Sequence, residues 1–222
     1  MKIICVLIGL TLCVAGCGGG GGSSHGDDVI VPAPAPAMFQ FSDGSIVLGE
    51  DKIHVSVKGV LLTLAAPDWQ NNLAQHTARD HFYIARRDQS FVAIAVQFDD
   101  KPFVKVLGDL EPIGQARFLR YDGEIDIRHV NFQGSANIGL QVNLASTEPR
   151  LTIYKSDLSI DVYASINSDG SFIKGRVTFD ESDEAPLVGG FFNTDDARQN
   201  ETLAGAFMGD TMYGTLVGQV AE

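Results

Sequence analysis

The sequence predicts an all-β protein, with a small β-rich N-terminal domain, here called the handle, and a C-terminal eight-stranded antiparallel β-barrel. Apolar residues fall at every second position in Ile138–Leu144 and in Leu158–Ala164, which is the period of a strand with one buried face. Signals for tight hairpin turns separate such segments at Asp122-Gly123, Asp169-Gly170 and Gly209-Asp210. About eight such segments follow Gln115, enough to close a small barrel that leaves no exposed strand edge.

The first residues of the sequence predict an export signal over residues 1–16. Met1-Lys2 supplies a positive charge, and the apolar run Ile3–Val14 leads into Ala15-Gly16-Cys17. The apolar run is too short to cross a bilayer of about 30 Å as a helix. Its end resembles the lipobox of bacterial lipoproteins, which implies cleavage before Cys17 and acyl chains, palmitate among them, that anchor the protein to a membrane. The alternative is an ordinary secretory signal with a chance cysteine.

Residues 17–37 predict a tether in two parts. Gly18–Gly22 and the serines after them form a flexible coil, whereas the alternating Pro-Ala stretch Val31–Ala37 favours a stiffer polyproline II spacer. Gly18 stands where an acidic residue would resemble a signal for inner-membrane retention. We therefore expect the lipid anchor to lie in the outer membrane.

Composition narrows the classes of partner. Cys5, Cys13 and Cys17 all lie in the signal or at the anchor, so the folded part has no disulfide. Removal of Lys2 with the signal leaves 15 basic and 28 acidic side chains, a net charge of −13. Such a surface repels nucleic acid and anionic lipid, so we expect no nucleic-acid partner.

The handle is expected to cover residues 38–110, and the barrel residues 111–222. Strands are predicted at Lys52–Val57, Val60–Leu64, His81–Arg86, Phe91–Asp99 and Lys101–Leu107. One helix is predicted over Asp68–Arg79, because Asp68 suits an N-cap. Trp69, Leu73 and His76 also recur at helical spacing. The proline and glycine of Leu110–Gly114 mark the boundary between the two domains.

The barrel sequence resembles a known family. Its last strands, in Gly189–Asn193, Leu203–Phe207 and Tyr213–Gly218, are similar to the closing strands of transferrin-binding protein B, and Pro112–Phe118 resembles that family's first barrel strand. Physically, glycine beside phenylalanine lets the large ring fill a narrow barrel. The residues that carry this signature are Gly189, Gly190, Phe191, Phe192, Gly205, Phe207, Tyr213, Gly214 and Gly218.

One handle and one barrel make the chain similar in build to compact relatives of that family, such as factor H-binding protein, HpuA and the hemophilins. The resemblance implies a cell-surface lipoprotein of the outer membrane, exported by a surface lipoprotein assembly modulator. It also implies a binding role, with an iron or haem source as ligand and a TonB-dependent receptor as partner. The alternative is a lipoprotein that binds a host factor or mediates adhesion without a cofactor.

Candidate binding residues are few. Aromatic and arginine side chains are enriched at protein interfaces, which in the handle selects Trp69, Asn71, Arg86 and Arg87. A single imidazole can ligate haem, which makes candidates of His54, His76, His81 and His129. For each of these residues an ordinary core or surface position is the competing interpretation. No group of His, Cys, Asp or Glu residues has the spacing of metal ligands. His76 and His81 come nearest, but they are five positions apart, whereas a step of four would place them on one face of a helix.

Catalysis and a membrane-embedded barrel are the weaker classes. The sequence has no Gly-x-Ser-x-Gly motif, phosphate loop or dinucleotide fingerprint, so we do not expect an enzyme. A barrel embedded in the membrane would make a lipid anchor redundant and would need a girdle of aromatic residues.

Overall fold

The structure is a computed structural model that describes residues 37–41, 44–48, 52–57, 60–65, 72–77, 81–88, 90–98, 101–193 and 199–221. All the regular elements in these ranges are β-strands. The described residues contain no helix with the length and hydrophobicity needed to cross a membrane. The predicted all-β class is confirmed. Cys17, the tether up to residue 36, Trp69 and Asn71 lie outside the described residues.

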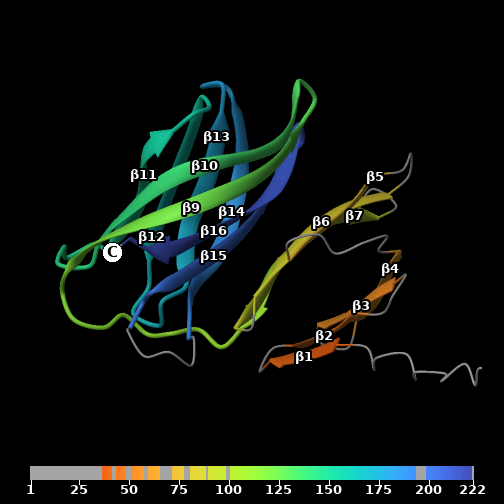
Figure 1. Ribbon diagram of the computed structural model, residues 1–222, viewed down its shortest axis with the longest axis horizontal. Helices are drawn as coiled ribbons and strands as arrows, with labels where there is room; N and C mark the ends of the chain where they lie inside the picture. The colour runs from red at the N-terminus through yellow and green to blue at the C-terminus, as the bar shows by residue number, and fades with distance from the viewer. Residues whose placement is uncertain are drawn as a thin grey trace, which may run out of the picture. The chain divides into compact units, whose positions relative to one another are not determined.

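Eight strands form a closed antiparallel barrel, as predicted (Figure 1). Each strand pairs with its neighbours in sequence, and β16 closes the barrel on β9 with a register that runs from Met212 opposite His129 to Val220 opposite Tyr121. The strands are β9 (Phe118–His129), β10 (Phe132–Asn143), β11 (Arg150–Ser156), β12 (Ile160–Ile166), β13 (Phe172–Phe179), β14 (Asp183–Phe192), β15 (Thr202–Met208) and β16 (Met212–Val220).

The handle consists of two four-stranded antiparallel sheets. The first contains β1 (Ala37–Phe41), β2 (Gly44–Leu48), β3 (Lys52–Val57) and β4 (Val60–Ala65). The second contains β5 (Leu73–Thr77), β6 (His81–Arg87), β7 (Phe91–Phe98) and β8 (Lys101–Gly108). In both sheets the strands follow one another in chain order, so each connection is a hairpin or a short link. By residue contacts, handle and barrel belong to one compact unit, Ala35–Glu222.

The helix predicted over Asp68–Arg79 is wrong for the part of it that the structure describes. Leu73–Thr77 is strand β5, which pairs with β6 so that Leu73 lies opposite Arg86 and Thr77 opposite Phe82. Ala74 is then buried in the handle core, while Gln75 and Thr77, which have the opposite parity, are exposed. The apolar residues at helical spacing were too few to outweigh the hydrogen bonds and burial that the sheet offers.

The tight turn predicted at Asp122-Gly123 is also wrong. Strand β9 runs through both residues without a break, and Gly123 pairs with Ile138 on one side and with Gly218 on the other. A Cβ at Gly123 would lie 2.5 Å from the Val217 carbonyl oxygen. The glycine thus allows close approach of the neighbouring backbone, a known role of glycine within strands. The structure does have the turns predicted at Asp169-Gly170 and Gly209-Asp210.

Alternate side chains of the barrel strands fill its interior. Tyr121, Phe191 and Phe207 are fully buried there, and the Phe191 ring lies between Tyr121 and Phe172, with ring centroids 6.2 and 6.0 Å away. Among the signature residues, Phe192 and Tyr213 instead point outward and pack on the handle, Phe192 against Phe91 and Tyr213 against Phe82.

Replacing Gly214 by alanine should overpack the barrel, because the new Cβ would lie 2.5 Å from the Phe207 ring and against the Asp126 carbonyl oxygen. We expect the free energy of unfolding to fall by about 1–3 kcal/mol, measured by denaturant unfolding. Gly134→Ala is the matched control, since its Cβ would meet only the end of the Phe132 ring, at 3.3 Å. Equal stability of the two variants would contradict this packing.

The second handle sheet is buried on both of its faces. On β7, Phe91 and Ala93 pack against Phe192, Ala204 and Ala206 of the barrel wall. The residues between them, Val92, Ile94 and Val96, face the first handle sheet. This explains why Phe91–Val96 is a continuous apolar run, as expected for a strand that is covered from both sides.

Candidate functional site

The candidate functional site is a polar cleft of about 400 Å³ between the handle and the barrel. Residues of β6 and the segment after it form one side, and residues of β9, β10 and β16 form the other. Arg86 and Arg87, both predicted as ligand contacts, lie in this cleft. Its lining residues are Asn72, Arg86, Arg87, Asp88, Phe91, Asp122, Gly123, Glu124, Asn137, Val217, Gly218 and Gln219.

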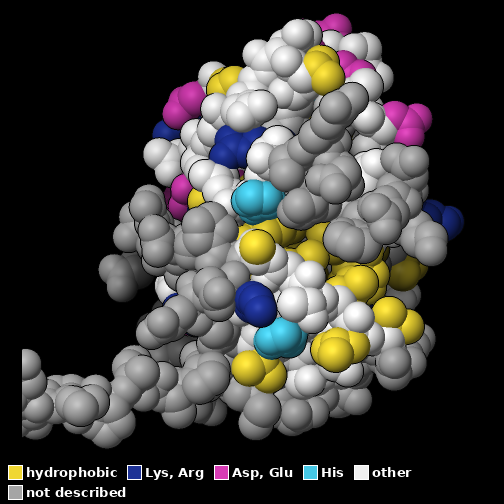
Figure 2. All heavy atoms as spheres, turned by 90° about the vertical axis from the view of Figure 1, so that its right-hand side faces the viewer, with side chains coloured by type: hydrophobic (Ala, Val, Ile, Leu, Met, Phe, Trp, Pro, Cys, Tyr) yellow, Lys and Arg dark blue, Asp and Glu magenta, His cyan; other side chains and the backbone are white. Residues whose placement is uncertain are grey.

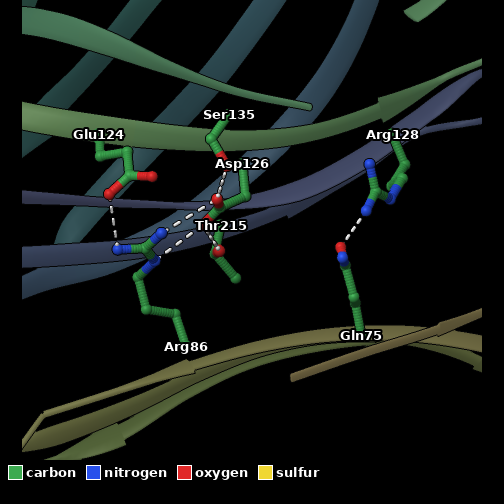
Figure 3. A network of polar contacts seen from close by, with 7 residues as sticks. All are labelled: Gln75, Arg86, Glu124, Asp126, Arg128, Ser135 and Thr215. Atoms are coloured by element: carbon green, nitrogen blue, oxygen red, sulfur yellow. Dashed lines mark hydrogen bonds and ion pairs between the residues drawn. The ribbon is translucent and has the colours of Figure 1, made fainter. Parts of the chain in front are cut away.

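Arg86 joins the two domains across the base of this cleft (Figure 3). Its Nε and Nη2 donate to the two carboxylate oxygens of Asp126, at 2.7 and 3.0 Å, and its Nη1 donates to Glu124 Oε2 at 3.0 Å. The paired contact with Asp126 is the fork geometry in which guanidinium binds carboxylate most strongly. Burial lowers the pKa of Arg86, but the hydrogen bonds and charges of Asp126 and Glu124 outweigh this and raise it above its ordinary value.

Asp126 is the centre of the network. It projects from β9 and is 1% exposed, and its oxygens also accept hydrogen bonds from Ser135 Oγ at 2.5 Å and Thr215 Oγ1 at 3.1 Å. Strands β10 and β16, on either side of β9, supply these two hydroxyls (Figure 3). A buried carboxylate is tolerated when its lone pairs are satisfied in this way, so the network fixes the handle on the barrel.

A second polar contact joins the domains beside the first. Arg128 of β9 donates a hydrogen bond to the Gln75 side chain of β5 (Figure 3). On the same wall of the barrel, Tyr213 stacks on Phe82 with ring centroids 4.0 Å apart. Ionic, polar and aromatic contacts therefore hold the two walls of the cleft in fixed positions. A binding site needs this preorganisation.

The two arginines predicted as ligand contacts occupy different positions in the cleft. Arg86 lies at the base of the cleft, committed to Asp126 and Glu124, whereas Arg87 is half-buried along its wall. The Arg87 backbone N–H donates to the carbonyl oxygen of Asn72 at 3.0 Å, and Asn72 has a φ of 64°. A ligand-binding role for these residues stays a prediction, as it does for Trp69 and Asn71 outside the described ranges.

His129 is enclosed at one end of the barrel. Its Nδ1 accepts a hydrogen bond from the Asn131 N–H at 3.2 Å, which leaves Nε2 to donate to Asp183 Oδ2 at 3.1 Å. The imidazole also contacts the Phe179 ring, with centroids 4.7 Å apart. A hydrogen bond from Thr211 lowers the pKa of Asp183, and His129 adds to this effect. Both ring nitrogens are thus engaged.

The other predicted haem ligands lie in the handle. His54 Nδ1 is 3.0 Å from Thr63 Oγ1 on the neighbouring strand, and the His76 ring stacks on Tyr83 with centroids 5.8 Å apart. His81 belongs to β6, but its side chain lies outside the described residues. Figure 2 shows two histidine side chains on one face, apart from each other, with hydrophobic and basic side chains between them. In the described part of the chain no cluster of potential metal ligands occurs.

A second cleft, of about 570 Å³, lies between β8 and β14. Val104, Val106, Val188 and Phe192 are among its apolar lining residues, and Lys105 is its basic residue. Neither this cleft nor Asp126 and Glu124 were identified from the sequence. Asp126 lies between two apolar residues in a pattern of period two, as any outward-facing strand residue does. Its role in binding Arg86 is therefore visible only when the handle is packed on the barrel.

Comparison with known proteins found no family model and no curated protein that matches this chain. Among solved structures, transferrin-binding protein B from Neisseria meningitidis is 13% identical with a TM-score of 0.44, over 76% of this chain and 39% of that one. HpuA, a haemoglobin receptor from Kingella denitrificans, is 12% identical with a TM-score of 0.44, over 86% and 88% of the two chains. A surface lipoprotein is 13% identical with a TM-score of 0.40, over 77% and 93%. The chain thus spans about two fifths of transferrin-binding protein B.

Proposed function

We propose that this chain is a lipid-anchored binding protein of the bacterial outer surface. In this proposal it captures a protein that carries iron or haem and presents it to a TonB-dependent receptor in the outer membrane. The observation that carries the proposal is the polar cleft between handle and barrel, whose walls the Arg86–Asp126 ion pair holds in place. A cleft with fixed walls binds with less loss of conformational entropy than one that must be ordered by its ligand.

The N-terminal sequence also supports this proposal. A lipobox at Cys17, followed by a Gly/Ser and Pro/Ala tether, is suited to holding a folded body away from a membrane. The net charge of the mature chain, −13, favours a partner with a basic contact surface, because opposite charge speeds encounter. Lipid attachment predicts an acylated cysteine at the mature N-terminus, which mass spectrometry can detect. An unmodified N-terminus elsewhere would contradict the anchor.

The ligand is proposed to be a protein rather than free haem. His54 and His76 are engaged within the handle, and His129 uses both ring nitrogens inside the barrel. None of these three side chains lines either cleft. The cleft at Arg86 is also lined mainly by polar and charged residues, whereas pockets for small cofactors are mainly apolar and enclose most of their ligand.

The test uses the mature chain, residues 17–222, immobilised and exposed in turn to haemoglobin, transferrin and haemin. We expect saturable binding of one of the two iron-carrying proteins and no Soret shift with haemin alone. A Soret shift without protein binding would overturn the choice of ligand. Binding of an iron-free serum protein instead would favour the alternative, capture of a host factor without cargo.

Replacing Arg87 by alanine should weaken that binding at least about fivefold, the effect of losing a contact worth about 1 kcal/mol. The melting temperature should change by less than it does when the Arg86–Asp126 contact is removed, because Arg87 is half-buried on the cleft wall whereas Arg86 and Asp126 are buried at the junction. Lys52→Ala is the matched control, since that lysine is an exposed cation of β3 in the handle and does not line the cleft. Equal affinity of the Arg87 variant and the wild type would remove the cleft as the binding site.

A further inference from the structure

The outer wall of the barrel carries a group of arginine and aromatic side chains that neither cleft includes. The group spans five neighbouring strands, β9 to β13 (Figure 1), and we call it the arginine–aromatic wall. Three of its members are arginines, and each has its guanidinium over an aromatic ring. Its residues are Phe118, Arg120, Arg150, Tyr154, Tyr163 and Arg176.

Arg120 is held between two rings. Its guanidinium carbon lies 5.3 Å from the centroid of Tyr154 and 5.9 Å from that of Phe118, within the range of a cation–π interaction. Tyr154 belongs to β11 and Arg120 to β9, so the tyrosine ring reaches across β10. It does so over Gly139, where a Cβ would lie 2.7 Å from the Tyr154 ring. The glycine leaves the space in which the ring lies.

Among the described residues, no carboxylate forms an ion pair with Arg120. Over the described residues, Arg150 pairs with Glu148 at 2.5 Å and Arg176 with Glu184 at 4.0 Å, whereas the contacts of Arg120 there are the two rings. Asp122, the next outward residue of β9, lines the cleft at Arg86. A cation without a carboxylate on the wall of an acidic protein is complementary to an acidic ligand.

The rings beside Arg120 remain exposed. Phe118 is 53% and Tyr154 43% exposed, although large aromatic side chains are usually buried. An aromatic ring that covers a glycine can stabilise a strand by itself, which accounts for Tyr154 but not for Phe118 or for the position of Arg120. Exposed aromatic rings around an arginine have the composition of a protein-binding hot spot.

We propose that the arginine–aromatic wall is a second binding surface, separate from the cleft, that takes an acidic segment of a partner protein. A carboxylate of the segment pairs with the Arg120 guanidinium, which Tyr154 and Phe118 hold in place. An apolar side chain next to that carboxylate packs on the exposed edges of the two rings. This surface would engage a partner whether or not the cleft is occupied.

The test is titration of the ¹⁵N-labelled mature chain with the peptide acetyl-Glu-Phe-Glu-Glu-Phe-Glu-amide, followed by NMR. We expect a saturable shift of the Arg120 Nε signal and weaker binding as salt is added. Arg120→Gln should raise the Kd at least about tenfold, and Gly139→Ala, which displaces the Tyr154 ring, at least about threefold. Lys52→Gln is the matched control and should change the Kd less than about twofold, because Lys52 is an exposed cation of β3 in the handle that belongs neither to the wall nor to the cleft.

Thermal melting checks that each variant is folded. Equal binding of the peptide with lysine in place of glutamate would overturn the proposal, as would unchanged affinity in Arg120→Gln or shifts confined to Asn72 and Gln219 in the cleft. Heparin that shifts the Arg120 signal where the peptide does not would overturn the assignment to a protein segment. The outcome is independent of the iron-carrier test, because the probe, the residues and the readout all differ.

Discussion

Replacing Phe207 by alanine will lower the free energy of unfolding by about 3–5 kcal/mol. Phe207 is fully buried in the barrel interior, and its ring fills the space left by Gly214 on the neighbouring strand. Truncation leaves a cavity that the closed barrel cannot collapse into without breaking strand pairing. The described part of the chain has no cysteine, so no disulfide offsets the loss. For a body of this size the melting temperature should fall by about 6–20 °C.

Phe118→Ala is the control for this prediction, since it removes the same side chain from the outside of the same barrel, where Phe118 is 53% exposed. We expect its effect to stay within about 1 kcal/mol. Thermal and urea unfolding of both variants measure the difference. If Phe207→Ala and Phe118→Ala have the same melting temperature, then Phe207 does not stabilise the barrel interior as described.

Replacing Asp126 by alanine will destabilise the junction of handle and barrel by about 3–5 kcal/mol, because it leaves the guanidinium of Arg86 buried without its main partner. The Arg86 side chain is 11% exposed and that of Asp126 2%, so solvent cannot take the place of the carboxylate. Ser135 and Thr215 would lose their acceptor as well. Urea unfolding of the variant measures the cost.

The double variant Arg86→Met, Asp126→Leu distinguishes the stabilisation that comes from the ion pair itself from the cost of leaving one of its charges buried and unpaired. We expect it to recover most of the stability lost by Asp126→Ala, because apolar residues of similar volume commonly replace a buried ion pair at little cost. Arg86→Met alone should be nearly as damaging as Asp126→Ala, since it strands the carboxylate. A double variant as unstable as the single ones would mean that the ion pair itself, rather than its exclusion from water, stabilises the junction.

Local patterning was sufficient to predict the barrel. Period-two stretches such as Ile138–Leu144 and the turn at Gly209-Asp210 depend on neighbouring residues alone, and β10 and the hairpin of β15 and β16 are where the pattern places them. The errors arose where long-range contacts decide the structure. The cross-strand partners of Gly123 and the pairing of Leu73–Thr77 with β6 belong to other parts of the chain.

The candidate site was predictable only in part. Arg86 and Arg87 could be selected as arginines in the handle, but the partner of Arg86 is forty residues away in the barrel. Nothing near Asp126 distinguishes it from the exposed acidic residues of other strands. One usable signal was the unbroken apolar run Phe91–Val96, which indicates a strand covered on both faces and therefore a sheet packed between two partners.

In the proposed function, this chain is a binding protein that a lipid at Cys17 anchors to the outer surface of the cell. Protease treatment of intact cells that express it is the most direct test. The proposal predicts that external protease removes the handle and barrel while a periplasmic control protein stays intact, and that Cys17→Ala abolishes the cell-bound pool. A body that resists protease on intact cells and is cleaved only after lysis would contradict the claim.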